Sequence, residues 1–250
     1  MRYLILSDVH ANIDALESVL AAALPDAWDR AVVLGDLVGY GAEPNAVIER
    51  IRGLDPLLVI RGNHDKAACG IDDGSSFNVV ARTAAHWTMA ALTPANLAYL
   101  RELPAGPAAV DDLVEICHGA PFDEDHYIFD EGDAARALDT STRRVCLFGH
   151  THLPAVFVDS VDGTGEVRGM APEPADDSVV SVRKGRRYLV NPGSVGQPRD
   201  GDPRAAFGVY DAGRQTLRLR RVPYPVPDAQ RRILEAGLHP SLAARLAIGR

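Results

Sequence analysis

The stretch that decides the fold reads Ala31-Val32-Val33-Leu34-Gly35-Asp36. It is an apolar run, rich in β-branched residues, that stops at a glycine and then a carboxylate. Such a run is typical of a buried strand, and open α/β sheets place their chemistry just beyond the carboxyl ends of their strands. Taken alone, Asp36 could cap a helix, form a salt bridge or bind a metal ion, and the helix cap would be the best interpretation.

Four further strand-like runs end in side chains that can bind a metal ion. Beyond their last apolar residues follow Asp8 and His10, Asn63 and His64, His118, and His150 and His152. Two successive strand-helix-strand units predict parallel pairing with right-handed crossovers, so the first three strand ends should lie on one edge of a sheet. A carboxylate that bridges two cations would explain why so many ligand-type side chains converge, and we take Asp36 to be that bridge.

These side chains have the chemistry of a binuclear metal centre. Asp and His bind divalent transition metals well, and two such ions about 3.5–4 Å apart can hold both the attacking and the leaving oxygen of a phosphoryl transfer. A pair such as Asp8 and His10 is a weak signal by itself, because short motifs also match by chance. Five ligand clusters at five strand ends are hard to reconcile with scattered, solvated polar residues.

Hydrophobic periodicity predicts strands that alternate with helices, followed by shorter strands later in the chain. The expected strands cover residues 3–6, 31–36, 56–60, 113–117, 145–148, 155–158, 188–190, 207–210 and 217–222. The expected helices cover residues 13–23, 43–51, 77–103 in two parts, 132–138, 228–236 and 240–248. Residues 163–178, rich in Gly, Pro and acidic side chains, are predicted to form a mobile surface loop.

The composition is that of a soluble globular protein of 250 residues, enough for one large α/β domain or two small ones. The formal net charge of -8 argues against a general binder of nucleic acid or anionic membranes, which would need a basic face. No apolar run approaches a membrane-spanning length, and no signal peptide precedes the first strand, so we expect a cytoplasmic location. The three cysteines, Cys69, Cys117 and Cys146, show no pairing motif and favour a reducing compartment.

In their order along the chain, the motifs resemble the signature of the calcineurin-like metallophosphoesterases. The matching segments are Ser7-Asp8-Val9-His10, Gly35-Asp36, Gly62-Asn63-His64-Asp65, His118-Gly119, Gly149-His150-Thr151-His152 and a late loop, Asn191-Pro192-Gly193-Ser194-Val195-Gly196-Gln197-Pro198. The resemblance covers the whole chain and is closest to compact bacterial and archaeal members. It implies an α/β fold, a four-layer α-β-β-α sandwich of two mixed sheets, in a single domain over residues 1–250. Residues 75–104 could form a helical cap over the site, or a plain connecting hairpin.

The resemblance also implies a role for each matching side chain. Asp8, His10 and His152 would hold one ion, Asn63, His118 and His150 would hold the other, and Asp36 would bridge them. His64 would protonate the leaving group, oriented by Asp65. The cofactors would be two divalent transition-metal ions, and the ligands suit manganese, iron, nickel or zinc alike.

We therefore expect a di-metal phosphoesterase that hydrolyses phosphodiester or phosphomonoester bonds by attack of a metal-activated hydroxide, with His64 as general acid. The expected substrate is a small phosphate ester or nucleotide-type molecule. Asn12 and Arg199 could contact its phosphate, although Asn12 is better explained as a helix cap and Arg199 fits a surface salt bridge equally well.

Two alternative functions stay open. One is a nuclease, which the net charge disfavours although one basic cluster could track a phosphate backbone. This cluster consists of Arg183, Lys184, Arg186 and Arg187. The other is a non-catalytic scaffold that keeps the fold and the metal ions, and loss of His64 or of ligands would have favoured it.

Overall fold

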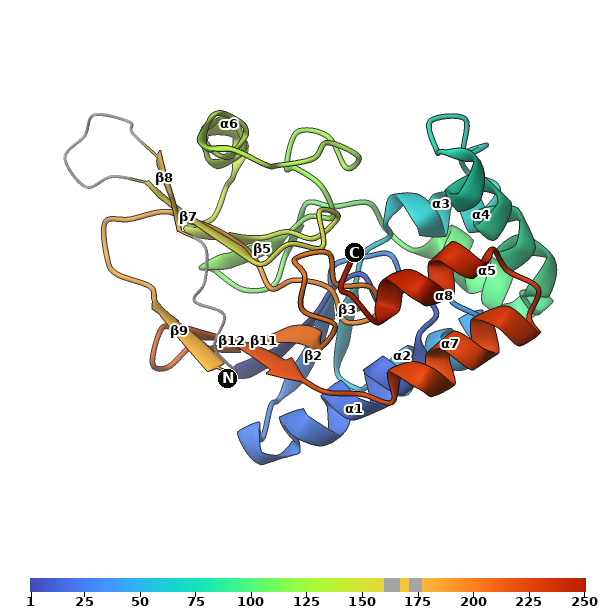
Figure 1. Ribbon diagram of the computed structural model, residues 1–250. Helices are drawn as coiled ribbons and strands as arrows, with labels where there is room; N and C mark the ends of the chain where they lie inside the picture. Colours follow the sequence, from blue (N-terminus) through green and yellow to red (C-terminus); the bar gives the residue numbers. More distant parts are fainter. Residues whose placement is uncertain (160–166, 171–176) are drawn as a thin grey trace.

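The computed structural model describes residues 1–159, 167–170 and 177–250. In this part of the chain two sheets of six strands each face one another, and helices cover their outer faces (Figure 1). Helix α6 (Glu131–Thr140) lies on one side of the pair of sheets, and α1 (Ile13–Ala23) lies on the other. The four-layer α-β-β-α sandwich of two mixed sheets expected from the resemblance is confirmed.

The first sheet has the strand order β3-β2-β1-β11-β12-β9. Its strands are β1 (Arg2–Leu6), β2 (Arg30–Val33), β3 (Leu57–Val59), β9 (Asp177–Ser181), β11 (Ala205–Asp211) and β12 (Thr216–Val222). The first three pair in parallel, because α1 and α2 (Pro44–Arg52) form the crossovers between them. The remaining pairs are antiparallel.

The second sheet has the strand order β4-β5-β6-β10-β7-β8. Its strands are β4 (Ala108–Ala109), β5 (Val114–Ile116), β6 (Val145–Leu147), β7 (Ala155–Asp159), β8 (Val167–Met170) and β10 (Tyr188–Asn191). Strands β5, β6 and β10 are parallel, and the outer pairs are antiparallel. Each sheet therefore has a parallel half that can carry a site at its carboxyl edge.

Alternation of side chains along the strands divides the interior into layers. In β1, Tyr3 and Ile5 pack between the two sheets, whereas Leu4 and Leu6 pack under the helices. In β6, Val145 points into the space between the sheets, and its neighbour Cys146 joins the core under α6. Strands buried on both faces explain why the sequence shows continuous apolar runs rather than a polar alternation.

Helices α4 (Val79–Ala91) and α5 (Pro94–Glu102) confirm the two helices expected within residues 77–103, with Thr93 capping the second. Helices α7 (Val226–Glu235) and α8 (Pro240–Leu246) end the described chain, as expected. Two short helical elements were not expected, a 3-10 turn η1 (Leu24–Asp26) and α3 (Asn63–Cys69). No helix in the described ranges is long and apolar enough to cross a membrane.

The surface loop expected over residues 163–178 is partly wrong. Residues 167–170 form β8, which pairs with β7, and Asp177 begins β9, which pairs with β12. Both are edge strands: β8 pairs with β7, which closely precedes it, and β9 pairs with β12, which lies far along the chain. Such strands depend on their pairing partners, and the amino-acid composition does not show this pairing. The rest of the predicted loop, residues 163–166 and 171–176, lies outside the described residues.

Candidate metal centre

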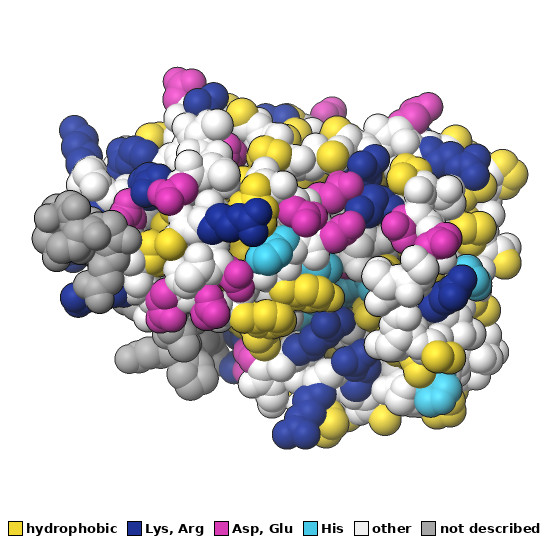
Figure 2. Space-filling model, turned by 90° about the horizontal axis from the view of Figure 1, so that it is seen from above, with side chains coloured by type: hydrophobic (Ala, Val, Ile, Leu, Met, Phe, Trp, Pro, Cys, Tyr) yellow, Lys and Arg dark blue, Asp and Glu magenta, His cyan; other side chains and the backbone are white. Residues whose placement is uncertain are grey.

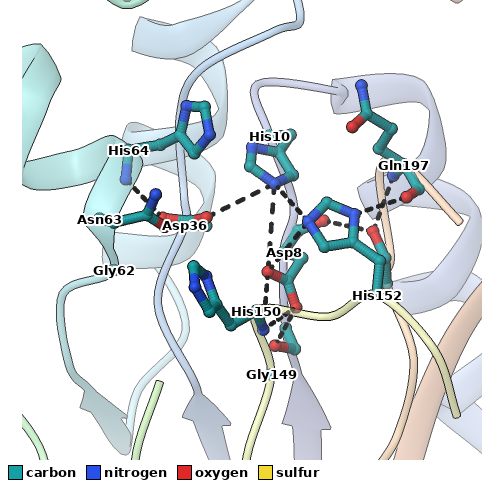
Figure 3. A network of polar contacts seen from close by, with 12 residues as sticks. Asp8, His10, Asp36, Gly62, Asn63, His64, Gly149, His150, His152 and Gln197 are labelled. Carbon is teal, nitrogen blue, oxygen red and sulfur yellow. Dashed lines mark hydrogen bonds and ion pairs between the residues drawn. The ribbon is translucent and has the colours of Figure 1, made fainter. Parts of the chain in front are cut away.

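The parallel halves of both sheets bring the seven predicted ligands to one place. Asp8 and His10 follow β1, Asp36 follows β2, and Asn63 begins α3 just after β3. From the second sheet, His118 follows β5, and His150 and His152 follow β6. The side chains converge where the carboxyl ends of these strands meet (Figure 3).

Four of these side chains form a first cluster, Asp8, His10, Asp36 and His152, whose ligand atoms all lie within 4.8 Å of one another. Figure 3 shows His10 between Asp36 on one side and Asp8 and His152 on the other. The Nε2 atom of His10 lies 3.1 Å from Nε2 of His152 and 3.6 Å from Oδ2 of Asp36. The Nε2 atom of His152 lies 3.4 Å from Oδ1 of Asp8. Two imidazoles and two carboxylates at this spacing could hold one divalent cation.

A second cluster shares Asp36 with the first. It consists of Asp36, His118 and His150, again with ligand atoms within 4.8 Å of one another. Oδ2 of Asp36 lies 3.4 Å from Nε2 of His118, which also lies 3.2 Å from the amide oxygen of Asn63. One carboxylate therefore lies in both clusters, which is the geometry of a bridging ligand.

Backbone carbonyls orient all four histidines among the seven predicted ligands. The pairs are Nδ1 of His10 with the oxygen of Val38 at 3.1 Å, Nδ1 of His118 with Leu34 at 2.8 Å, Nδ1 of His152 with Gln197 at 2.6 Å, and Nε2 of His150 with Asp125 at 3.1 Å. A carbonyl only accepts, so each of these ring nitrogens donates its proton. In a neutral ring the other nitrogen then keeps its lone pair for a metal ion.

The backbone of the site is strained at the ligands themselves. Positive φ angles occur at Asp8 (52°), His10 (49°), Asp36 (51°), His150 (66°) and His152 (62°). Such conformations cost non-glycine residues on the order of 1–3 kcal/mol each and concentrate at functional sites. Two glycines permit the close approach of the loops: a Cβ on Gly62 would overlap the Asp36 carboxylate, and one on Gly149 would overlap Ser7.

Three of the four predicted imidazole ligands are in the neutral form that binds metal ions, and His118 is the exception. Burial lowers the pKa of the His10 and His152 imidazoles well below the usual value and that of His150 to about 3, so these rings are neutral, the form that binds metals. Burial would raise the pKa of Asp36, but His118 and His64 outweigh it and hold that pKa well below its usual range. Burial would lower the pKa of His118, and the neighbouring Asp36 charge instead raises it to about 10.

His64 lies beside the clusters rather than within them. Its ring packs 4.3 Å from the ring of Tyr40 and 4.5 Å from that of Phe77, between ring centroids, and its backbone N–H donates to Oδ1 of Asp36 at 2.8 Å. Among the described residues its buried Nδ1 has no hydrogen-bond partner. Burial lowers the pKa of His64 to about 4.

The orientation of His64 by Asp65, implied by the resemblance, needs correction. The Asp65 carboxylate accepts hydrogen bonds from the backbone N–H groups of Gly62 at 2.9 Å and Val38 at 3.2 Å. It therefore stabilises the start of α3 and joins it to the loop after β2. Both carboxylate oxygens thus accept from backbone N–H groups, and among the described residues no hydrogen bond joins Asp65 to the His64 ring.

Asn12 has the capping role rather than a free amide. Its Oδ1 accepts from the backbone N–H of Ala15 at 3.1 Å, and its Nδ2 donates to the oxygen of Gly196 at 2.9 Å. Since both polar atoms of the side chain are used by the fold, we do not keep Asn12 among the phosphate contacts.

Arg199 forms no salt bridge within the described ranges, so the surface ion pair weighed for it is not observed. Its Nη2 donates to Oε1 of Gln197 at 3.1 Å, and its Nε is buried without a hydrogen-bond partner among the described residues. Its positive charge acts on the Asp8 carboxylate and on the His10 and His152 imidazoles. It remains a candidate for a substrate phosphate.

Sequence reasoning missed several residues that complete the site. The Asp125 carbonyl holds His150, and Lys66 holds the Asp125 carboxylate, with Nζ 2.6 Å from Oδ2. The ring of Tyr127 stacks on His150 at 3.8 Å between centroids. Of the carbonyl partners, Gln197 could have been found from the sequence, because it lies in the late loop that matches the family. Asp125 could not, because every residue has a backbone carbonyl and the residue type does not show which one contacts a histidine.

The class of protein follows from the comparison with known families. Residues 1–214 match the calcineurin-like phosphoesterase superfamily domain, and the chain belongs to this family. It is 40% identical to a metallophosphoesterase from Sphaerobacter thermophilus of known crystal structure, covering 100% of this chain and 99% of that one with a TM-score of 0.87. It is 31% identical to an uncharacterised protein of Methanocaldococcus jannaschii, over 98% of this chain and 97% of that protein. A hypothetical protein from Pyrococcus horikoshii OT3 shares the fold at 20% identity, with a TM-score of 0.79.

Proposed function

We propose that the protein is a di-metal phosphoesterase that hydrolyses phosphodiester or phosphomonoester bonds of a small substrate. The observation that carries the proposal is the position of Asp36, which is shared by two buried clusters of Asp and His side chains. Membership of the calcineurin-like family supports the same chemistry. Two bound ions would activate the attacking water and neutralise the phosphoryl oxygens.

In this proposal each ligand keeps the role that the resemblance implies. Asp8, His10 and His152 would hold one ion, Asn63, His118 and His150 would hold the other, and Asp36 would be shared by both. The orientation of the four imidazoles by carbonyls supports the assignment, because the rings are fixed before an ion arrives. The donor set suits manganese, iron, nickel or zinc.

His64 acts as the general acid in this proposal. The support for this role is that its ring lies next to that of His10, 5.0 Å away between centroids, and so beside the proposed ligands rather than among them. With a pKa of about 4 the ring is neutral in the free protein. An anionic phosphate beside the ring favours its charged form, so the proton would be taken up as the substrate binds.

The proposal is tested by metal content and activity together. Protein purified without chelator and reconstituted with manganese or zinc should contain close to two ions per chain and hydrolyse bis(4-nitrophenyl) phosphate or 4-nitrophenyl phosphate. Asp36→Asn should weaken both ions, because one carboxylate serves both, whereas His152→Ala should weaken mainly one. Absence of metal after reconstitution, or equal mild losses in the two variants, would contradict the proposal.

The structure favours small substrates over nucleic acid. The basic cluster Arg183–Arg187 precedes β10, which is parallel to β6, so it lies at the opposite edge of the sheet from His150. Arg187 moreover pairs with Asp159 at 2.8 Å. A nucleic acid held by this cluster would therefore not reach the site. The non-catalytic scaffold has no observation in its favour, because every expected ligand lies in the clusters or beside them.

The helical cap over residues 75–104 is kept as a proposal, within a single domain over residues 1–250. The contact that supports it is that of Phe77 with His64. The alternative, a plain connecting hairpin, is supported by the burial of Leu92 and Leu100 in the core under the helices.

A further inference from the structure

Two aromatic side chains at the edge of the candidate metal centre have exposed rings. Tyr127 is 41% exposed and Phe129 is 61% exposed. The ring of Tyr127 lies 3.8 Å from that of His150 between centroids, with 23° between the planes. The ring of Phe129 lies 5.4 Å from that of Tyr127, with 5° between the planes. The three rings therefore form a stack that leads from a proposed metal ligand to the surface. On the face shown in Figure 2, hydrophobic side chains lie beside histidine side chains in the middle of the molecule.

The segment between β5 and α6 fixes the position of these two rings. Ile128, which lies between them in the chain, is buried in the core under α6, whereas its two neighbours are exposed. Before the pair, the Asp125 carbonyl accepts from His150. At its end, the backbone N–H of Phe129 donates to Oδ2 of Asp133 in α6 at 3.3 Å. The rings are thus held by an apolar anchor in the middle and by hydrogen bonds on both sides.

Within the described residues, no other Phe, Tyr or Trp side chain is exposed to this degree. The remaining large hydrophobic side chains that are exposed there, such as Val79, Val179 and Leu234, are aliphatic. Single exposed apolar side chains are normal, whereas adjoining ones next to a site indicate a binding surface. A centroid distance of 5.4 Å between nearly parallel rings means that they are displaced sideways. Part of a ring face is therefore left open for a further ring.

The charge around the two rings favours a ligand group without negative charge. Residues 123–133 contain neither lysine nor arginine, and their acidic side chains are Asp123, Glu124, Asp125, Asp130, Glu131 and Asp133. An anionic group would be repelled here, whereas the proposed metal centre beside it suits an anion. The two neighbouring surfaces thus suit the two ends of one ester, with the phosphoryl group at the metal centre and an uncharged ring on the aromatic pair.

We propose that Tyr127 and Phe129 bind an uncharged aromatic ring carried by the alcohol group of the substrate, which stacks on them while the phosphoryl group lies at the metal centre. This inference rests on the proposed phosphoesterase function and names the residues that select the organic part of the ester. Stacking on rings that are already fixed costs little conformational entropy. It also distinguishes a planar ring from a puckered ring of similar size.

Calorimetric titration of the manganese-loaded full chain with two phosphonates tests the proposal. Phenylethylphosphonate carries a planar ring and cyclohexylethylphosphonate a puckered ring of similar size, and water cleaves neither. The ratio of their dissociation constants measures the preference for an aromatic ring. We expect the wild-type protein to favour the phenyl compound about fivefold, equal to about 1 kcal/mol. Phe129→Leu should bring the ratio close to one, whereas Phe129→Tyr, which keeps a ring, should retain the preference.

The matched control is Val179→Ala, which shortens an exposed apolar side chain of the edge strand β9 and should leave the ratio unchanged. Thermal melts and metal content measured after titration verify that each variant is folded and loaded. A ratio near one in the wild-type protein would overturn the inference without any variant. An unchanged ratio in folded Phe129→Leu would also overturn it, and a change of oligomeric state in that variant would then assign the rings to a protein interface.

Hydrolysis of bis(4-nitrophenyl) phosphate by the wild-type protein separates the two proposals. Its absence refutes the phosphoesterase, whereas its presence with a phosphonate ratio near one refutes only the aromatic site.

Discussion

His64 is the residue whose chemistry depends most on the leaving group of the substrate. A general acid assists departure of an alkoxide and matters little for nitrophenolate, which is stable as an anion. We expect His64→Gln to lose roughly 10²–10⁴-fold in turnover of alkyl phosphate esters and much less on nitrophenyl esters, with its metal retained. Steady-state kinetics on both ester types checks this.

Two other outcomes would exclude the acid role of His64. Equal losses on both ester types would indicate electrostatic stabilisation of the phosphoryl oxygens instead. A parallel loss of metal and of melting temperature would indicate a structural histidine, which its packing against Tyr40 and Phe77 could also produce.

Lys66 acts on His150, a proposed metal ligand, through one intermediate residue. Its ammonium group binds the carboxylates of Glu124 at 3.0 Å and Asp125 at 2.6 Å, and the Asp125 carbonyl accepts from His150. Lys66→Met should loosen this carbonyl and weaken the ion held by His150 by roughly 10–100-fold, the usual effect of outer-shell partners. Metal titration followed by calorimetry measures it.

A surface ion pair provides the control for Lys66. Arg50→Met removes an exposed pair with Glu17 and should leave the affinity for both ions unchanged. If Lys66→Met weakens both ions equally, Lys66 supports the fold as a whole rather than His150.

At the residue scale, the sequence predicted ligand types but not their partners. Asp8, Asp36 and the histidines were recognisable because few other side chains bind transition metals. The carbonyls of Val38, Leu34 and Asp125 were not, since every residue carries one and only the fold decides which of them faces a ring. The role expected of Asp65 was wrong for a related reason: a carboxylate next to a proposed catalytic residue in sequence can instead accept hydrogen bonds from the backbone.

At the scale of elements, the hairpin of α4 and α5 offers a test of the proposed cap. Phe77, just before α4, contacts His64, whereas the far end of the hairpin is tied to α2 by Asn45, which bonds Ala91 and Thr93 at 2.8 and 2.9 Å. We expect Phe77→Ala to lower turnover of alkyl esters, because the imidazole loses one wall of its packing.

Asn45→Ala is the matched change at the other end of the hairpin. Loss of its hydrogen bonds should lower stability by about 1–3 kcal/mol with little effect on kinetics. Melting temperatures and Michaelis parameters of both variants check this. Unchanged kinetics in Phe77→Ala would favour the plain connecting hairpin.

The elements themselves were predictable to different degrees. Apolar runs and helical spacing located most of them, and Thr93-Pro94 correctly marked the start of α5. Helix α3 was missed because its seven residues include the site motif Asn63-His64-Asp65, and so short a helix shows no periodicity. Strands β8 and β9 were missed because they exist through pairing with β7 and β12.

At the scale of the whole molecule, periodicity could predict parallel strands but not that they divide into two facing sheets. Tyr3 and Ile5 of one sheet share a core with Val145 of the other, although more than a hundred residues separate them. That pairing of sheets came from the resemblance to a family. The candidate metal site is complete only when the two sheets face one another, because the first sheet contributes Asp8 and Asp36, and the second contributes His118 and His152.

A site built from both sheets should couple metal binding to global stability. Without ions, Asp8 and Asp36 lie buried near one another, and burial raises the pKa of Asp8 to about 6. Ions that bind only the folded protein stabilise it by about 2.7 kcal/mol at a concentration one hundred times the dissociation constant. For a domain of this size we therefore expect chelation to lower the melting temperature by roughly 5–10 °C.

Manganese or zinc should restore the melting temperature, and the melting temperature of Asp36→Asn should respond to metal far less than that of the wild-type protein. Calorimetric melts with and without chelator, with metal content measured on the same samples, decide the matter. A melting temperature that stays constant after the ions are removed would show that the two sheets hold the ligands in place without them.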